Sequence, residues 1–266
     1  MKIYISADIE GVTGIVNAEE TNSSFNDVYK PFAIQMSREV AAACEGANIA
    51  GAKEIWIKDG HGNGRNIFQN ELPLNTKLIR NWSGHPFHMM EQLDNSFDAI
   101  LMIGYHSPAG SNTNSLAHTI NGRKYHKIIL NGEIMSEFIL NAYTASYVGV
   151  PVVFLSGDAG ICDIVKNYNS NISALSVNTG IGNSVLSIHP QLALASISES
   201  VEAALLSNLD DCLIELPDYF KLEIEFKSHK EAYNASFYPG ATQTAPHTIC
   251  YENKDYFEIL RFLHFV

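Results

Sequence analysis

The sequence predicts an α/β protein, with a mostly parallel β-sheet that carries helices on both faces and a smaller α+β part at the C-terminal end. Over most of the chain, short apolar segments typical of strands alternate with segments whose apolar residues recur at helical spacing. Residues 97–106 (FDAILMIGYH) are almost continuously apolar, as strands buried on both faces are. Residues 219–228 (YFKLEIEFKS) instead alternate polar and apolar residues, which predicts a different kind of sheet.

Each element follows from its local pattern. Residues 28–52 carry apolar residues at helical spacing and end at Gly51, which predicts a long helix. Further helices are predicted over residues 85–93, 134–148, 160–168 and 255–266. Strands are predicted over residues 2–7, 54–58, 76–81, 97–106, 125–132, 150–158, 172–177, 219–228 and 247–252. We therefore predict a main α/β domain over residues 1–214 and a smaller part over residues 215–266 that packs on it.

Composition excludes several classes of partner. The chain of 266 residues has 17 Lys and Arg against 29 Asp and Glu, a formal net charge of -12, and no basic run, so nucleic acid would be repelled over most of the surface. We find neither a signal-type N-terminus nor an apolar run near the about 18 residues of a membrane helix, so we expect a cytoplasmic protein without a membrane partner. The four cysteines form no CxxC pair and are expected to be reduced and packed.

Polar side chains gather where the predicted strands end. Asp8 and Glu10 end the first strand, and two carboxylates aimed at one place repel unless a proton or a cation lies between them. The other strand-end residues are Asp59, His61, His106 and Asp158. Carboxyl ends of parallel strands share one edge of a sheet, where imidazoles and carboxylates together suit zinc, and manganese or iron less specifically. For the acid pair alone, a strand end that opens into a solvated turn is an equal alternative.

Two further segments offer candidate ligands or catalytic groups. The small, polar loop 107–120 carries His118, either as a flap that places an imidazole over the metals or as a plain surface loop. Glu133 and Glu137 lie four residues apart near the start of the predicted helix 134–148, where the helix dipole favours acids in any protein. At most one of the two glutamates is needed as a ligand.

Six blocks, SADIEG, KDGH, IGYH, AHTI, SEFILNAY and VPVVFLSGD, occur in an order that resembles the D-aminopeptidase family of binuclear zinc peptidases. The resemblance implies two zinc ions per chain, held by Asp8 as bridging ligand, Glu10 and His61 on one ion, and His106 and Glu137 on the other. It selects Glu137 over Glu133, because the family's glutamate directly precedes the segment matching FILNAY. It also implies that His118 is the catalytic residue, as nucleophile or base, and that the chains assemble as stacked rings that form a homodecamer.

The leading functional hypothesis is therefore a zinc aminopeptidase. It would act by a two-metal mechanism on short peptides or amino-acid amides, including those with D-residues at the N-terminus. One alternative is a metal-dependent phosphoesterase, although the strand-end motifs lack the Lys or Arg that a phosphate site usually uses. Another is a non-enzymatic metal- or peptide-binding assembly protein. The presence of His118 beside a full ligand set favours an enzyme.

Asn178 and Asn183 stand where relatives often carry Lys and Arg. If those charges pair with a substrate carboxylate, this chain has replaced them with neutral amides and should prefer amides, esters or longer peptides over free dipeptides. An equal alternative is that this segment lies away from the site and that the charges of the relatives only join subunits. Both interpretations make these residues candidates to compare with the structure.

Overall fold

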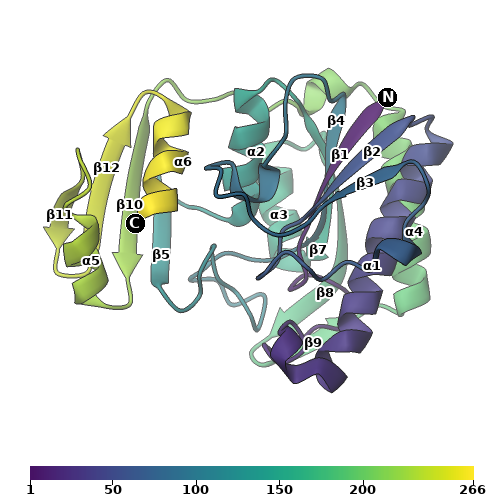
Figure 1. Ribbon diagram of the computed structural model, residues 1–266, viewed down its shortest axis with the longest axis horizontal. Coiled ribbons are helices and arrows are strands. Elements are labelled where there is room, and N and C mark those ends of the chain that lie inside the picture. The colour runs from purple at the N-terminus through teal and green to yellow at the C-terminus, as the bar shows by residue number, and fades with distance from the viewer.

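A computed structural model describes residues 1–266 as two β-sheets flanked by helices (Figure 1). The larger sheet contains β1 (Lys2–Ala7), β2 (Glu54–Asp59), β3 (Thr76–Ile79), β4 (Ala99–Tyr105), β7 (Val152–Asp158), β8 (Ser173–Ile181) and β9 (Ser184–Ser187). Its order is β3-β2-β1-β4-β7-β8-β9, and every pair is parallel except β8 with β9. The predicted α/β class and mostly parallel sheet are confirmed.

Four long helices cover this sheet, and they are α1 (Asn26–Ile49), α2 (Glu137–Tyr147), α3 (Ala159–Tyr168) and α4 (Pro190–Leu205). Helices α1 and α4 lie on one face and α2 and α3 on the other, so the prediction of helices on both faces is confirmed (Figure 1). Helix α4 was not among the predicted elements. Its start signal is Pro190, the first helical residue, preceded by His189 whose ring accepts a hydrogen bond from the Gln191 N–H.

The second sheet is antiparallel and has the order β11-β12-β10-β5-β6. Its elements are β5 (Tyr125–Leu130), β6 (Glu133–Ile134), β10 (Phe220–Phe226), β11 (Thr242–Ala245) and β12 (Thr248–Asn253), with α5 (His229–Ala235) and α6 (Tyr256–Phe265) beside them. The alternation predicted for β10 is present, because every second residue is buried. The strand predicted over 125–132 pairs with β10 rather than with the parallel sheet. The division at residues 214 and 215 stays a prediction.

One predicted helix is wrong. The segment over 85–93 forms only a single 3-10 turn, His88–Met90. His88 has φ 49° and Gln92 has φ 65°, and neither value is compatible with a right-handed α-helix. Local periodicity favoured a helix here, but the chain turns sharply at both residues.

The two sheets share one hydrophobic core. The 69 buried apolar residues of this core form a single cluster that reaches both sheets, so neither sheet has a separate core of its own. Strands β4 and β7 are buried along their whole length, as the apolar run in 97–106 predicted. All four cysteines are buried and free, as expected. None of the helices is both long and apolar enough to cross a membrane.

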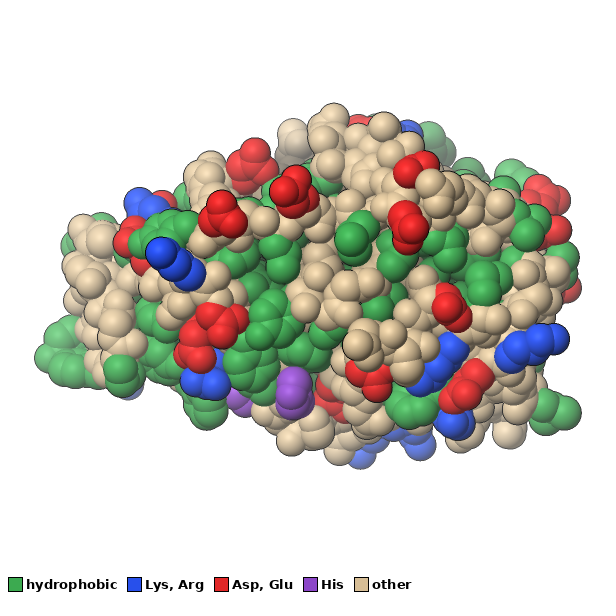
Figure 2. Space-filling model, turned by 90° about the horizontal axis from the view of Figure 1, so that it is seen from above, with side chains coloured by type: hydrophobic (Ala, Val, Ile, Leu, Met, Phe, Trp, Pro, Cys, Tyr) green, Lys and Arg blue, Asp and Glu red, His purple; other side chains and the backbone are tan.

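The surface reflects the acidic composition. Figure 2 shows one face on which acidic side chains are spread widely and the Lys and Arg side chains lie interspersed with them. No basic patch stands out on that face, in agreement with the formal net charge of -12. A polyanionic partner would therefore find no continuous docking surface there.

The segment after β1 lies tightly against the end of β4. The Asp8 N–H donates to the Ile103 carbonyl (2.8 Å) and the Gly11 N–H donates to the Gly104 carbonyl (2.9 Å). Gly104 has φ 73°, and a Cβ at this residue would lie 2.3 Å from the Asp8 carbonyl oxygen. Only glycine tolerates both this conformation and this approach. The contact fixes the backbone of Asp8 beside β4.

We predict that Gly104→Ala destabilises the fold and moves Asp8. Gly149→Ala is the matched control, because Gly149 also has a positive φ (79°) but a Cβ there would meet no atom within 4 Å. The control should cost about 1 to 2 kcal/mol for the left-handed conformation alone, and Gly104→Ala about 1 to 3 kcal/mol more for the overlap. Urea unfolding of both variants measures the difference. Equal losses would show that the β1 segment has room to move.

Candidate metal centre

The residues predicted to bind metal lie at the point where the strand order reverses. From β1 the chain adds β2 and β3 on one side, and it then adds β4, β7 and β8 on the other. Asp8 follows β1 and His106 follows β4, so both lie at the carboxyl ends of the two strands that flank this switch point. In open α/β sheets ligands bind in the crevice at this place, because the neighbouring loops diverge there.

The five predicted ligands come together, with Asp8 in the middle. His61 Nδ1 lies 3.3 Å from Asp8 Oδ1 and 3.0 Å from Glu10 Oε2. His106 Nε2 lies 3.4 Å from Asp8 Oδ2 and 3.6 Å from Glu137 Oε1. Each oxygen of Asp8 therefore faces a different imidazole, and each imidazole faces one further carboxylate. This is the arrangement expected of a carboxylate that bridges two ions.

Backbone carbonyls orient the three imidazoles. The ring nitrogens that face carbonyls are His61 Nε2 with Thr21 (2.9 Å), His106 Nδ1 with Ser107 (3.0 Å) and His118 Nδ1 with Leu116 (2.8 Å). A carbonyl oxygen can only accept, so each of these nitrogens carries a hydrogen. The neutral ring then has its lone pair on the other nitrogen, which faces the carboxylates. Metal-binding histidines are held in this way in known sites.

The donor atoms fit a metal ion. His106 Nε2 and Glu10 Oε2 are both buried and have no hydrogen-bond partner, which is costly for a polar atom unless a cation lies beside it. Two ligands at about 2.0 to 2.1 Å from a tetrahedral zinc would lie about 3.3 Å apart, and the observed nitrogen to oxygen distances of 3.0 to 3.6 Å bracket that value. Imidazole and carboxylate donors also match the chemistry of zinc.

The electrostatics indicate that this place attracts positive charge. Burial alone would raise the pKa of Asp8, but His106 and His61, when protonated, donate hydrogen bonds to it and carry positive charge, and both effects lower its pKa well below the ordinary value. Burial likewise would lower the pKa of both histidines, yet the neighbouring carboxylates raise it well above the ordinary value. Protons on the imidazoles and metal ions thus compete for the same carboxylates.

Glu137 is positioned by the start of α2 and by a strained turn. Ser136 caps the helix by accepting from the Ile139 N–H (3.2 Å). Glu137 Oε1 accepts from the Ile120 N–H (2.7 Å). Ile120 has φ 62°, an unusual and costly conformation for a β-branched residue. Glu133 instead lies on β6 and accepts from the Tyr168 hydroxyl (2.7 Å), outside the cluster.

His118 lies beside the cluster and faces a cavity. Its ring stacks on that of His106, with centroids 4.4 Å apart and planes 16° apart, and its Nε2 lies 3.9 Å from Glu137 Oε1. A cavity of about 750 Å³ is lined by His118 together with Glu10 and His61. The loop 107–120 therefore places an imidazole where a bound small molecule would meet the predicted metal ligands. His118 is near enough to be a ligand itself.

Two other strand-end acids have structural partners. Asp59 accepts from the backbone N–H of Asn66 and of Ile67, and also from the Asn66 side chain. Asp158 caps α3 and accepts from Ser107 and Asn114, which fastens the loop after β4. Both carboxylates support the loops that carry the site. Neither faces the cluster of predicted metal ligands.

Asn178 and Asn183 are not brought to the cavity. The Asn178 side chain is buried, where it accepts from the Gly14 N–H (3.1 Å) and donates to the Val12 carbonyl (2.8 Å). It thereby supports the loop that follows Glu10. Asn183 lies exposed in the turn between β8 and β9, and neither residue lines the cavity.

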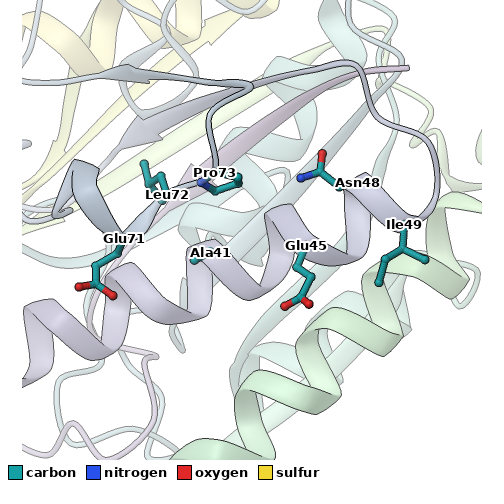
Figure 3. A pocket seen from close by; sticks show the side chains of 7 residues that line it. All are labelled: Ala41, Glu45, Asn48, Ile49, Glu71, Leu72 and Pro73. Carbon is teal, nitrogen blue, oxygen red and sulfur yellow. The ribbon is translucent and has the colours of Figure 1, made fainter.

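A second hollow lies along α1 and the short segment after residue 70 (Figure 3). Its two charged side chains are Glu45 and Glu71, and Glu71 pairs with Arg38 at 3.9 Å. It contains no imidazole and no buried polar atom that lacks a partner. This hollow therefore lacks the imidazoles and the buried, unpartnered polar atoms that distinguish the cluster of predicted metal ligands.

An open α/β sheet with carboxylates and imidazoles gathered at its switch point is the arrangement of a metallohydrolase. The family model for peptidases described as D-aminopeptidase matches residues 1–265, and the chain belongs to this D-aminopeptidase family. The D-aminopeptidase of Bacillus subtilis (strain 168) is 29% identical over 262 residues, which cover 97% of this chain and 93% of that protein. The family assignment agrees with the resemblance seen in the sequence.

The fold also matches a solved structure. The Zn-dependent D-aminopeptidase DppA from Bacillus subtilis, described as a self-compartmentalizing protease, superposes with a TM-score of 0.91 at 26% sequence identity. The match covers 99% of this chain and 95% of that chain. Both sheets therefore belong to the shared architecture.

Sequence reasoning missed two residues of the loop beside the metal cluster. Ile120 donates its N–H to Glu137, but its positive φ could not be predicted, because an isoleucine gives no sign of a strained backbone. Arg123 lines the cavity, and its signal was its place five residues after His118. The carbonyls that orient the histidines carry no sequence signal, since every residue has one.

We predict that Asp8→Ala loses both metal ions, because both imidazoles face its oxygens, whereas His61→Ala mainly weakens one. Elemental analysis of the purified, zinc-supplemented proteins gives the ratios. His126→Ala removes an exposed imidazole on β5, away from the cluster, and should leave the native ratio unchanged. A native ratio of one ion or fewer per chain would contradict the two-ion site.

Proposed function

We propose that this protein is a zinc-dependent aminopeptidase that hydrolyses short peptides or amino-acid amides, including those with D-residues at the N-terminus. The observation that carries the proposal is Asp8, which lies between two imidazoles that each face a second carboxylate. Family membership supports the peptidase activity, and the solved relative DppA is described as Zn-dependent.

In this proposal two zinc ions bind per chain. Asp8 would hold both ions, Glu10 and His61 would complete the site of one, and His106 and Glu137 would complete that of the other. When bound, zinc acts as a Lewis acid toward the scissile carbonyl and lowers the pKa of bound water toward about 7. Backbone carbonyls keep the imidazole donors in place, because each of the two rings donates a hydrogen bond to one of them.

His118 is proposed as the catalytic residue. Its Nδ1 donates to the Leu116 carbonyl, so the neutral ring presents a lone pair at Nε2. That nitrogen lies beside Glu137, at a wall of the cavity. It can accept a proton from the attacking group and return it to the departing amine, or attack the carbonyl itself.

The two alternatives receive less support. Family membership favours a peptidase over a phosphoesterase. Family membership also favours a peptidase over a purely binding protein. We also propose a homo-oligomer, because the relative DppA is described as self-compartmentalizing. The decameric ring assembly and the cytoplasmic location remain predictions.

The substrate class can be tested directly. We expect the zinc-loaded protein to hydrolyse D-alanyl p-nitroanilide, to lose this activity with a chelator and to regain it with zinc, because the reaction requires the metal. It should not hydrolyse p-nitrophenyl phosphate under the same conditions. Release of nitrophenol without release of nitroaniline would favour the phosphoesterase instead.

For His118→Ala we predict intact metal binding and lost turnover. A proton-transfer group contributes roughly two orders of magnitude or more, so kcat should fall by about that factor while the zinc ratio and the melting temperature stay native. Elemental analysis and thermal unfolding accompany the assay. Loss of zinc in this variant would show that His118 is a ligand. Unchanged turnover would show that His118 has no catalytic role and that its loop is a plain surface loop.

A further inference from the structure

The cavity beside the metal cluster has an asymmetric distribution of charge. Its charged lining residues are Glu10, a predicted metal ligand, and Arg123, and the rest of its wall is neutral apart from the two histidines His61 and His118. One end of a bound molecule would thus meet the metal site and another part would meet a guanidinium group. An amino-acid or peptide zwitterion has this same separation of charge.

The Arg123 side chain is free to bind an anion. The residue is exposed, and its guanidinium group forms no hydrogen bond or ion pair with the rest of the chain. Only its backbone N–H is used, as a donor to Asn121 Oδ1 (3.0 Å). Among the residues that line the cavity, Arg123 is the only Lys or Arg. A guanidinium group binds a carboxylate with two parallel hydrogen bonds.

The backbone that carries Arg123 is held in place. Ile120 occupies the centre of a γ-turn, in which the Asn121 N–H donates to the Thr119 carbonyl (2.7 Å), and its own N–H is bound by Glu137. Lys227, the residue after β10, donates a hydrogen bond from its Nζ to the Gly122 carbonyl (2.6 Å). Such strain persists only where the surroundings fix the backbone, and it is concentrated at functional sites.

The same turn limits the separation of His118 and Arg123. Five residue steps separate His118 from Arg123, so even an extended chain would span at most about 17 Å between the two Cα atoms. The γ-turn and a hydrogen bond from the Lys124 N–H to the Asn121 carbonyl (3.0 Å) shorten this span. The Cα atoms of His118 and Arg123 are therefore close enough for one short peptide to contact both residues.

We propose that Arg123 binds the free C-terminal carboxylate of a short peptide and so makes the protein select free peptides over their amides. This proposal rests on the aminopeptidase function proposed above. It replaces the preference for amides expected from Asn178 and Asn183, because the structure places neither side chain at the cavity. The positive charge that recognises the carboxylate comes from a different loop.

The test compares D-alanyl-D-alanine with its C-terminal amide. We expect the native, zinc-loaded protein to have the higher kcat/KM for the free dipeptide. Arg123→Ala should lower that value about tenfold or more, mainly through KM, whereas the amide should lose much less. Arg123→Lys keeps the charge without the paired donors and should fall between. Arg80→Ala is the matched control, since Arg80 is exposed outside this cavity and should leave the ratio native.

Binding is measured separately by calorimetry with zinc-loaded His118→Ala, with and without Arg123→Ala. Tighter binding of the free dipeptide than of its amide, lost with Arg123→Ala, is expected. A native preference for the amide, or equal losses for both ligands with Arg123→Ala, would overturn the proposal. Failure of the native protein to hydrolyse either compound would instead overturn the aminopeptidase function, and the calorimetric comparison would still decide the role of Arg123.

Discussion

The site depends on the burial of three carboxylates around two imidazoles. Asp8, Glu10 and Glu137 are each at most 5% exposed, and like charges so placed repel strongly unless positive charge lies among them. The neighbouring carboxylates raise the pKa of both histidines, so protons on the imidazoles are favoured as one source of that charge. The fold therefore stabilises a cluster whose charge is balanced only by a cation or by protons that a cation can displace.

The position of that cluster follows from strand geometry. Asp8 follows directly after β1. Its backbone is fixed there because it packs tightly against Gly104 of β4 and donates a hydrogen bond to the Ile103 carbonyl. Structural acids then hold the neighbouring loops, as Asp158 does for the loop after β4 and Asp59 does for the loop that carries His61. The predicted metal ligands thus gain rigid surroundings from residues that lie outside their cluster.

The strand pattern located Asp8, Glu10, His61 and His106 because parallel strands deliver their carboxyl ends to one edge, and apolar runs mark strands clearly. Glu137, at the start of α2, was selected over Glu133 only by the family resemblance. The strand pattern could not separate Asp59 and Asp158 from the cluster, since identical side chains at strand ends differ only in the loop backbone that they meet. The structural role of Asn178 could not be predicted either, because its partners Gly14 and Val12 are far away in sequence. The pairing of β5 with β10 depends on tertiary contacts that local patterns do not contain. Helix α4 does have a local start signal, Pro190, which the predicted elements left out.

The pairing of β5 has a consequence for how the chain can be divided. The loop with His118 and Arg123 leads directly into β5, and β5 lies between β6 and β10. Without residues 215–266, β5 would keep only the two-residue strand β6 beside it, and Lys227 would no longer hold Gly122. The C-terminal fifth of the chain is thus part of the scaffold for the cavity, and a gene that ended before β10 would encode the predicted metal ligands without a fixed wall for that cavity.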